Sequence, residues 1–305
     1  MNLYRLPLYA VLSWIALLSV SYAQELEPRR WAHVPVDTNF FGAGYVRTDG
    51  DVLFDPVLRI EDATVSINSI IATYLRSFDW SGRTARFDIR VPYQKATWKG
   101  LLDGAPAKVV REGLGDPRIR LSVNFIGAPA LKGKEFQSYR ASRVVNTVVG
   151  AALAITLPLG QYKEDKLLNL GQNRFSIRPQ LGVVHTRGPW SFELTGSVFF
   201  FSDNDEFFNG SKREQDPLYT LQAHIVRNFR HGIWGSLSAG TVRAGQSSIN
   251  AEEKDDQKED SLYAVSAGMA VSRTSSVKIA YAKGRTHKEV GSDADNIAVA
   301  YIRAF

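Results

Sequence analysis

Charged and polar side chains occupy every second position in several short segments of this sequence, and cations predominate among them. One such series is Arg86, Asp88 and Arg90, and another is Arg118 and Arg120. Guanidinium groups hold carboxylates through paired, charge-assisted hydrogen bonds, and rings of arginine in a confined passage favour anions. The full set of candidates that would line a passage is Arg86, Asp88, Arg90, Arg118, Arg120, Arg174, Arg178, Gln180, Glu193, Gln222, His224 and Lys278.

Two interpretations of this polar series remain open. In the first, the side chains form a pathway for small anionic or polar organic solutes. In the second, the arginines pair with Asp88, Glu193 and a segment of the chain that enters the interior, so that they only fill it. Both interpretations require elements that point one set of side chains inward and the other set outward.

Other chemistry finds little support. The absence of cysteine excludes zinc–thiolate sites, iron–sulfur clusters and cysteine nucleophiles. None of the 5 histidines (His33, His185, His224, His231 and His287) lies in an HExxH motif or in a His-x-Ser pair of the outer-membrane lipase type. The acidic residues of 201–207 and 251–260 are more typical of turns and solvated loops than of cation sites. We therefore expect no catalytic residues, no metal and no cofactor.

Alternation with a period of two residues dominates the chain and indicates β-strands with two unlike faces. In 117–126, for example, Ile119, Leu121 and Val123 alternate with arginine, serine and asparagine. A change of parity between Ile67 and Tyr74 suggests a β-bulge. We expect about twelve strands, each near the length of a tilted membrane-spanning strand. They lie near 38–48, 64–79, 85–94, 117–126, 145–158, 173–182, 190–200, 219–225, 232–244, 263–271, 277–284 and 297–305.

The connections between these strands alternate between short and long. Tight turns are expected at 80–83, 187–189, 229–232 and 273–275. Longer polar loops are expected at 49–63, 98–116, 159–171, 202–217, 247–260 and 286–294. This layout is typical of outer-membrane barrels, whose short turns are periplasmic and whose long loops are extracellular. The segment 127–144 is long on the short-turn side, and we expect it to carry a helical turn.

The apolar parity of the strands is expected to face lipid. On this face, aromatic residues lie near the strand ends, as in the aromatic girdle at a membrane interface. They are Tyr93, Phe125, Trp190, Phe200, Tyr219, Tyr263, Tyr281 and Tyr301. A soluble β-sandwich also alternates, but its outer face would mix Lys and Glu rather than repeat Arg, Gln and Asn. The predicted fold is therefore all-β, a closed antiparallel transmembrane β-barrel over 38–305.

Both ends of the chain carry signals for the route to a membrane. Residues 1–23 combine Arg5, an apolar run and small residues before the cleavage site after Ala23, as in a secretory signal peptide rather than a membrane anchor. Residues 24–37 form either a lumen plug or a periplasmic tail. Tyr301 and the final Phe305 resemble the terminal aromatic signal by which outer-membrane barrels are recognised for assembly. A formal charge of +6 together with secretion argues against a nucleic-acid partner.

Several motifs together resemble the outer-membrane transporter family of the meta-pathway of phenol degradation. They include 29–40, 79–93, 113–131, 157–182 and 188–205. The most specific block contains Pro158, Gly160, Tyr162, Leu167, Leu168, Asn169, Gly171, Asn173 and Arg174. Phe175 stands where the family often has tryptophan. The resemblance implies an outer-membrane barrel that admits aromatic compounds, and structural use of the motif's glycine and asparagines is favoured over contact with solute.

The leading hypothesis is a channel for passive uptake of small organic solutes, aromatic or anionic, in the outer membrane of a Gram-negative bacterium. Its expected partners are outer-membrane lipid, the barrel assembly machinery and the solutes themselves. The alternatives are an outer-membrane enzyme of the lipase kind and a structural or adhesion barrel.

Overall fold

The computed structural model describes residues 26–54, 60–229 and 232–305. The expected signal peptide (1–23) and His231 lie outside the described residues. Twelve of the described strands form one closed antiparallel barrel, in which each strand pairs with its neighbours in sequence order. They are β1 (Thr38–Leu53), β2 (Ile60–Trp80), β3 (Arg83–Leu102), β5 (Arg118–Ile126), β6 (Val145–Thr156), β7 (Ser176–Arg187), β8 (Trp190–Phe201), β11 (Leu218–Asn228), β12 (Ile233–Ala244), β15 (Lys258–Ala270), β16 (Ser275–Thr286) and β17 (Gly291–Ala304).

The first and last strands close the barrel. β1 pairs with β2 on one side and with β17 on the other, in an unbroken register from Phe40 opposite Ala304 to Leu53 opposite Gly291. The backbone N–H groups of Asn39 and Phe305 donate to each other's carbonyl oxygens at 3.0 and 2.9 Å. Closure pairs backbone polar groups that hydrocarbon could not solvate. The predicted antiparallel barrel is confirmed, and a two-sheet sandwich is excluded.

Apolar side chains cover the outside of the barrel. The exposed large residues include Leu121, Leu153, Leu181, Leu194, Leu221, Leu237, Val265, Ile279 and Val299. Seven of the eight girdle aromatics are exposed, namely Tyr93, Trp190, Phe200, Tyr219, Tyr263, Tyr281 and Tyr301, whereas Phe125 is half-buried. Exposure of this much apolar surface suits a lipid environment.

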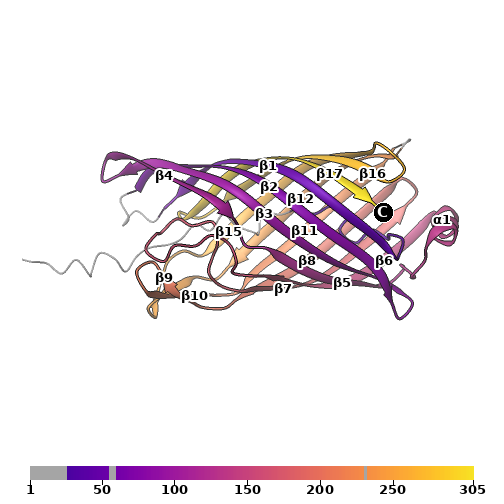
Figure 1. Ribbon diagram of the computed structural model, residues 1–305, viewed down its shortest axis with the longest axis horizontal. Coiled ribbons are helices and arrows are strands. Elements are labelled where there is room, and N and C mark those ends of the chain that lie inside the picture. The colour runs from indigo at the N-terminus through magenta and orange to yellow at the C-terminus, as the bar shows by residue number, and fades with distance from the viewer. Residues whose placement is uncertain (1–25, 55–59, 230–231) are drawn as a thin grey trace, which may run out of the picture.

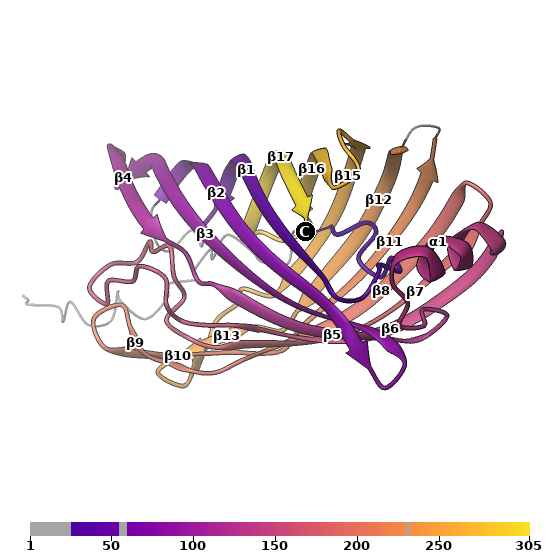
Figure 2. The ribbon, with the colours of Figure 1, turned by 45° about the vertical axis from the view of Figure 1, so that its right-hand side comes forward.

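The two ends of the barrel differ. The tight turns lie at the same end as helix α1 (Gly133–Ser142), which occupies the long connection 127–144 (Figure 1). The opposite, long-loop end carries a small sheet of β9 (Asn204–Phe207), β10 (Ser211–Gln215), β13 (Ser247–Ile249) and β14 (Glu252–Glu253) (Figure 2). Among the described residues, no helix is both long and apolar enough to cross a membrane.

The long connections contain more regular structure than expected. The segment 98–116 was expected to be a loop, but β3 continues to Leu102 and turns back as β4 (Ala105–Leu114), which pairs with β3 alone. Residues Asp103 and Gly104 have φ values of 51° and 76°, as a tight hairpin turn requires. Likewise, 202–217 and 247–260 contain the strands of the small sheet. These strands lie beyond the lipid belt, so the apolar alternation that identifies a membrane strand is absent there.

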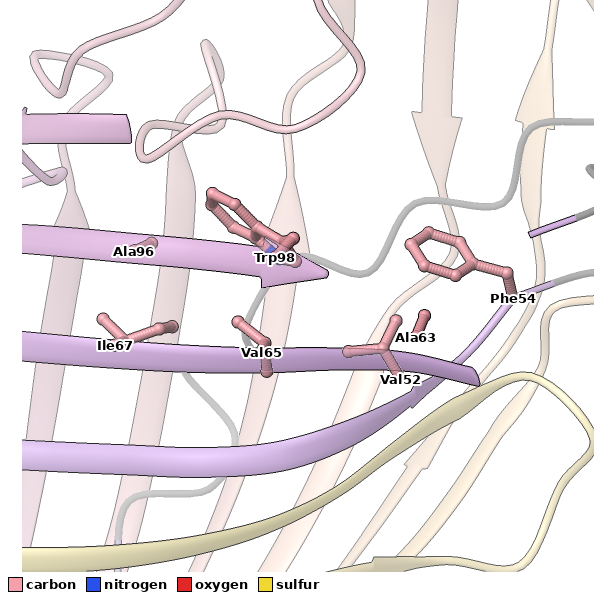
Figure 3. Packing of buried hydrophobic residues seen from close by; sticks show 7 residues of the cluster. All are labelled: Val52, Phe54, Ala63, Val65, Ile67, Ala96 and Trp98. Atoms are coloured by element: carbon pink, nitrogen blue, oxygen red, sulfur yellow. The ribbon is translucent and has the colours of Figure 1, made fainter. Parts of the chain in front are cut away.

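The bulge predicted between Ile67 and Tyr74 is wrong. β2 and β3 keep one register from Thr64 opposite Lys99 to Trp80 opposite Arg83, and the only shift lies between Glu61 and Thr64. The parity changes because Val65 and Ile67, 4% and 3% exposed, face the interior. They belong to an interior apolar cluster on β1, β2 and β3 at the long-loop end (Figure 3): Val52, Phe54, Ala63, Val65, Ile67, Ala96 and Trp98. Apolar residues at alternate positions therefore face lipid only along the part of the barrel whose interior is polar.

Removal of Phe305 is expected to reduce the amount of assembled barrel several-fold, whereas Arg303→Leu should be tolerated. Phe305 completes the last backbone pairing with Asn39, and its side chain is 67% exposed on the lipid face. Arg303 lies opposite Phe41 and Ser275 at the short-turn end, where its stem can follow the barrel while the guanidinium reaches the head groups. Heat-modifiable gel migration of outer-membrane fractions measures the assembled barrel. The reverse order of effects would contradict this orientation of β17.

Candidate functional site

The structure places most of the twelve polar candidates in the barrel interior. Ten are buried, namely Arg86, Asp88, Arg118, Arg120, Arg174, Arg178, Gln180, Glu193, Gln222 and His224, while Arg90 and Lys278 are half-buried. Within the strands they alternate with lipid-exposed residues, so their side chains point inward. β7 begins at Ser176, so Arg174 precedes the strand that was expected to carry it and lies towards the long-loop end.

A cluster of guanidinium groups lies on β3, β5 and β7. Arg120 donates through Nε to Asp88 Oδ2 at 3.0 Å and through Nη1 to Glu27 Oε2 at 2.7 Å. Arg118 donates through Nη2 to the other Glu27 oxygen at 3.3 Å. Arg86 and Arg178 are buried in the same region and interact electrostatically with Glu27. We call Arg86, Arg118, Arg120 and Arg178 the guanidinium cluster.

The adjoining part of the wall, formed by β8 and β11 next to β7, carries a less basic group. Glu193 and His224 are direct cross-strand partners, and His224 Nδ1 lies 2.8 Å from Ser238 Oγ. Glu193 accepts the backbone N–H of Arg29 at 2.7 Å. The N-terminal segment thus contacts both groups: Arg29 binds Glu193, and Glu27 binds the guanidinium cluster. Sequence reasoning alone did not assign any interior partner within 24–37.

Trp31 anchors the N-terminal segment inside the barrel. Its side chain is completely buried, and the indole Nε1–H donates to Thr195 Oγ1 at 2.8 Å. The indole rests on Gly150 and Gly182, which are direct cross-strand partners on β6 and β7. A Cβ at Gly182 would overlap the indole ring, and one at Gly150 would lie 2.6 Å from indole Cε3. The two glycines therefore form the space that accepts this tryptophan.

A second apolar cluster lines the interior near the guanidinium cluster. Phe199, Leu218, Val242 and Leu262 are buried together on β8, β11, β12 and β15, and Leu26 packs against them. We call these four residues the β8–β15 apolar cluster. The guanidinium carbon of Arg178 lies 4.5 Å from the centre of the Phe199 ring, a favourable cation–π geometry. Phe199 has the polar parity of β8, so only its departure from the Ser-Glu-Thr-Ser series of that face could have revealed it.

The family motif builds the long loop between β6 and β7. Asp116, which is 2% exposed, accepts the backbone N–H groups of Gly160 at 2.9 Å and Gln172 at 2.8 Å. Burial raises the pKa of the Asp116 carboxyl, and the two backbone hydrogen bonds oppose that rise. Gly171 lies against both: a Cβ there would approach the Asp116 carboxylate at 2.9 Å and the backbone of Gly160 at 3.0 Å.

Other motif residues bind the backbone and side chains of the long loops. Asn169 accepts the N–H of Lys163 at 2.9 Å and donates to the carbonyls of Lys163 and Lys166. Tyr162 donates its hydroxyl to the Glu206 carbonyl. Asn173 adopts a φ of 52° and donates to Asn204 and Glu206. Pro158 lies at the start of the loop, and Leu168 and Leu170 pack onto the interior apolar cluster of β1–β3. The loop is thereby folded onto the barrel interior at the long-loop end.

Gly160→Ala is expected to loosen this loop without unfolding the barrel. The added Cβ would lie 2.7 Å from the Asp116 backbone nitrogen and 2.8 Å from the Gly115 carbonyl carbon, which are backbone atoms that cannot rotate away. Trypsin added to intact cells should then cleave at Lys163 or Lys166 several times faster than in the wild type. Leu159→Ala, in the same loop at an exposed position, is the control. Unchanged cleavage of the Gly160→Ala loop would show that Asp116 does not hold it.

The histidines do not converge on one centre. His33 contacts α1 through Phe136 and Tyr139, and the described part of the chain holds no group of three His, Asp or Glu side chains placed to bind a metal. One arrangement was missed in the sequence: His287 Nε2 lies 2.8 Å from Ser261 Oγ. This serine–histidine pair is exposed near the outer end of β15. The nearby Glu259 carboxylate accepts a hydrogen bond from Arg243 at 3.1 Å and does not bind the imidazole.

A closed antiparallel barrel with an apolar belt and a charged interior defines the class of outer-membrane β-barrels. The family model for the MetA-pathway of phenol degradation matches residues 44–291. The chain belongs to this family, as the motifs of the sequence predicted.

Known structures share the fold. An outer membrane channel from Pseudomonas putida F1 is similar over 92% of this chain and 100% of that chain, with 22% identity and a TM-score of 0.76. The transport unit of the autotransporter AIDA-I from Escherichia coli is similar over 93% of this chain and 94% of that chain, with 8% identity and a TM-score of 0.54. No curated protein matches the sequence significantly.

Proposed function

We propose that this protein is an outer-membrane channel for the passive uptake of small organic solutes, aromatic or anionic, into a Gram-negative bacterium. The observation that carries the proposal is the guanidinium cluster, which lies in the interior of a closed barrel. The family's association with phenol degradation and the channel from Pseudomonas putida F1 support the same class of function.

The interior charges favour anions. Around Glu27 and Asp88 lie the four arginines of the guanidinium cluster and Arg30, so positive charge is in excess there. Attraction between a permeating anion and a fixed guanidinium is stronger in a confined, partly desolvated passage than in bulk water. In this proposal both interpretations of the polar series apply in part: some arginines are paired with Glu27 and Asp88, and the excess positive charge acts on a permeating solute.

We propose that the N-terminal segment narrows the pathway as a plug. A barrel of eight strands is filled by side chains and one of sixteen to eighteen strands leaves an open channel, so about twelve strands are expected to enclose a narrow lumen. Residues 26–36 occupy part of that lumen through the contacts of Glu27, Arg29 and Trp31. The proposal is thus a channel of small conductance that is selective by charge and by size.

Reversal potentials in planar bilayers test the channel. In a potassium chloride gradient, the purified barrel should prefer chloride over potassium. A preference for potassium, or no conductance, would contradict the anion pathway. Uptake into liposomes should rank aromatic acids above sugars, with phenol and toluene as neutral aromatic comparisons.

The hydrolytic alternative rests on the Ser261–His287 pair alone. We expect no hydrolysis of phospholipid esters, because the neighbouring Glu259 is bonded to Arg243 and does not orient the imidazole. Hydrolysis that disappears in Ser261→Ala would establish the alternative instead. If neither transport nor hydrolysis were measured, a structural or adhesion role would be favoured.

A further inference from the structure

We infer that Leu26 and Glu27 occupy a binding site for small hydrophobic carboxylates, formed by the guanidinium cluster and the β8–β15 apolar cluster. In this inference the two residues act as a built-in mimic of the solute, and an aryl carboxylate such as benzoate competes with them. The role of this site in uptake rests on the proposed channel function, whereas the binding site itself does not.

The carboxylate half of the site is defined by Glu27. Its two oxygens are bound by different arginines, Oε1 by Arg118 at 3.3 Å and Oε2 by Arg120 at 2.7 Å. Arg30 Nε, from the N-terminal segment itself, approaches Oε2 at 3.5 Å. The side chains of Arg118 and Arg120 are only 9% and 8% exposed. This is the charge-assisted geometry with which proteins hold free carboxylates.

The apolar half is defined by the adjacent residue. Leu26 packs on Phe199, Leu218, Val242 and Leu262, whose exposed fractions are 4%, 7%, 0% and 2%. Gly240 leaves room for it, since a Cβ there would lie 3.0 Å from Leu26 Cδ2. The site therefore combines an apolar part, which includes one aromatic ring and binds Leu26, with the arginines that bind the carboxylate of the next residue, Glu27.

Arg178 joins the two halves. Its guanidinium lies over the Phe199 ring and donates to Ser197 Oγ at 3.0 Å, and it also interacts electrostatically with Glu27. An aromatic ring bound in place of Leu26 would lie beside Phe199, while its carboxylate would reach Arg118 and Arg120. An inorganic anion can satisfy only the carboxylate half of this arrangement, and a neutral sugar has neither the carboxylate nor the apolar ring.

The charge of the walls requires an anion at this position. Arg90 and Arg118 are direct cross-strand partners, and like charges placed opposite each other are unfavourable. If Glu27 left, the guanidinium cluster would surround Asp88 without this second carboxylate, and a solute carboxylate would restore the charge balance. A tethered ligand competes at an effective concentration on the order of millimolar, so Glu27 should weaken solute binding in the wild type.

Calorimetric titration of the mature, detergent-solubilised barrel with benzoate tests the inference. Glu27→Gln should bind benzoate at least about tenfold more tightly than the wild type, because its neutral amide competes only weakly for Arg118 and Arg120. The neutral analogue benzamide should show no such gain. The matched control is Glu112→Gln, which removes a carboxylate paired with Lys95 at 2.7 Å on the exposed hairpin. Heat-modifiable migration establishes that each variant is folded.

A second variant probes the apolar half independently. Leu26→Gly should increase the affinity for benzoate more than the affinity for acetate, since only benzoate has a ring to fill the vacated space. Unchanged benzoate affinity in Glu27→Gln, or an equal gain for benzamide or in Glu112→Gln, would overturn the inference.

The outcome is distinguishable from that of the channel proposal. Anion-selective conductance without a gain in benzoate affinity would retain the channel and overturn the site. A gain in affinity with no conductance in bilayers would retain the site and contradict the channel.

Discussion

Gly182→Val is expected to expel Trp31 from the barrel interior and to raise the single-channel conductance several-fold. The valine side chain would occupy the position of the indole ring, because even a Cβ at Gly182 overlaps it. Loss of a buried tryptophan contact costs about 3–5 kcal/mol, which is enough to release a segment held by a few further contacts. β7 pairs with β6 and β8 through backbone hydrogen bonds, which do not involve the side chain at position 182. The barrel itself should therefore assemble.

A matched control lies on the next strand at the same depth. Gly196 of β8 pairs with Leu181, the neighbour of Gly182, and a Cβ there meets nothing within 4 Å. Gly196→Val should therefore conduct like the wild type. Trp31→Ala should produce the same increase in conductance, because it removes the indole itself instead of the space that Gly182 leaves for it. If Gly182→Val and Trp31→Ala both assembled and conducted like the wild type, the segment would not obstruct the pathway.

Arg178→Glu is expected to reduce the preference for chloride over potassium at least tenfold. The substitution changes the wall by two charges, and each unit charge acts on an ion about 4 Å away with about 1 kcal/mol in water. A total of about 2 kcal/mol corresponds to more than a tenfold change. The new carboxylate would lie near Glu27 and also near Arg118 and Arg120, all of which interact electrostatically with position 178. The two arginines offset the repulsion from Glu27, so the fold should tolerate the change.

Reversal potentials in asymmetric potassium chloride measure this change. Arg187→Glu, on the same strand but exposed at the tight turn, makes the same change of charge outside the interior. It should leave the selectivity close to that of the wild type. An equal loss of selectivity in both variants would mean that the overall charge of the barrel, and not the guanidinium cluster, selects the ion.

The barrel was predictable because its signal is local and repeated. Alternation in segments such as 117–126 reports two unlike environments for neighbouring side chains, and it recurs often enough to indicate about twelve strands. The same reasoning failed where the environments change along one strand. Because Val65 and Ile67 are apolar, the alternation rule would place them on the lipid face. They belong instead to the interior apolar cluster at the long-loop end. The hairpin of β3 and β4 was missed because its apolar side chains, Ala96, Trp98 and Val109, belong to the interior cluster and not to an alternating lipid face.

The interior partners could not be read from the sequence, since they depend on contacts between distant positions. Glu27 meets Arg120 across 93 residues, and Trp31 meets Thr195 across 164 residues. The family motif was recognised, but its role as a loop folded around Asp116 required the positions of Gly160 and Gln172.

By itself the sequence determined which side chains share a face, because a strand places successive residues on opposite sides whatever its neighbours are. The tertiary structure alone decided what each inward face meets. Closure of β1 on β17 turned the polar faces towards one another, and the small residues Gly150 and Gly182 came together on adjacent strands to admit Trp31. The free energy of burying that indole, with the Glu27 carboxylate among arginines, depends on side chains that only the closed barrel brings together.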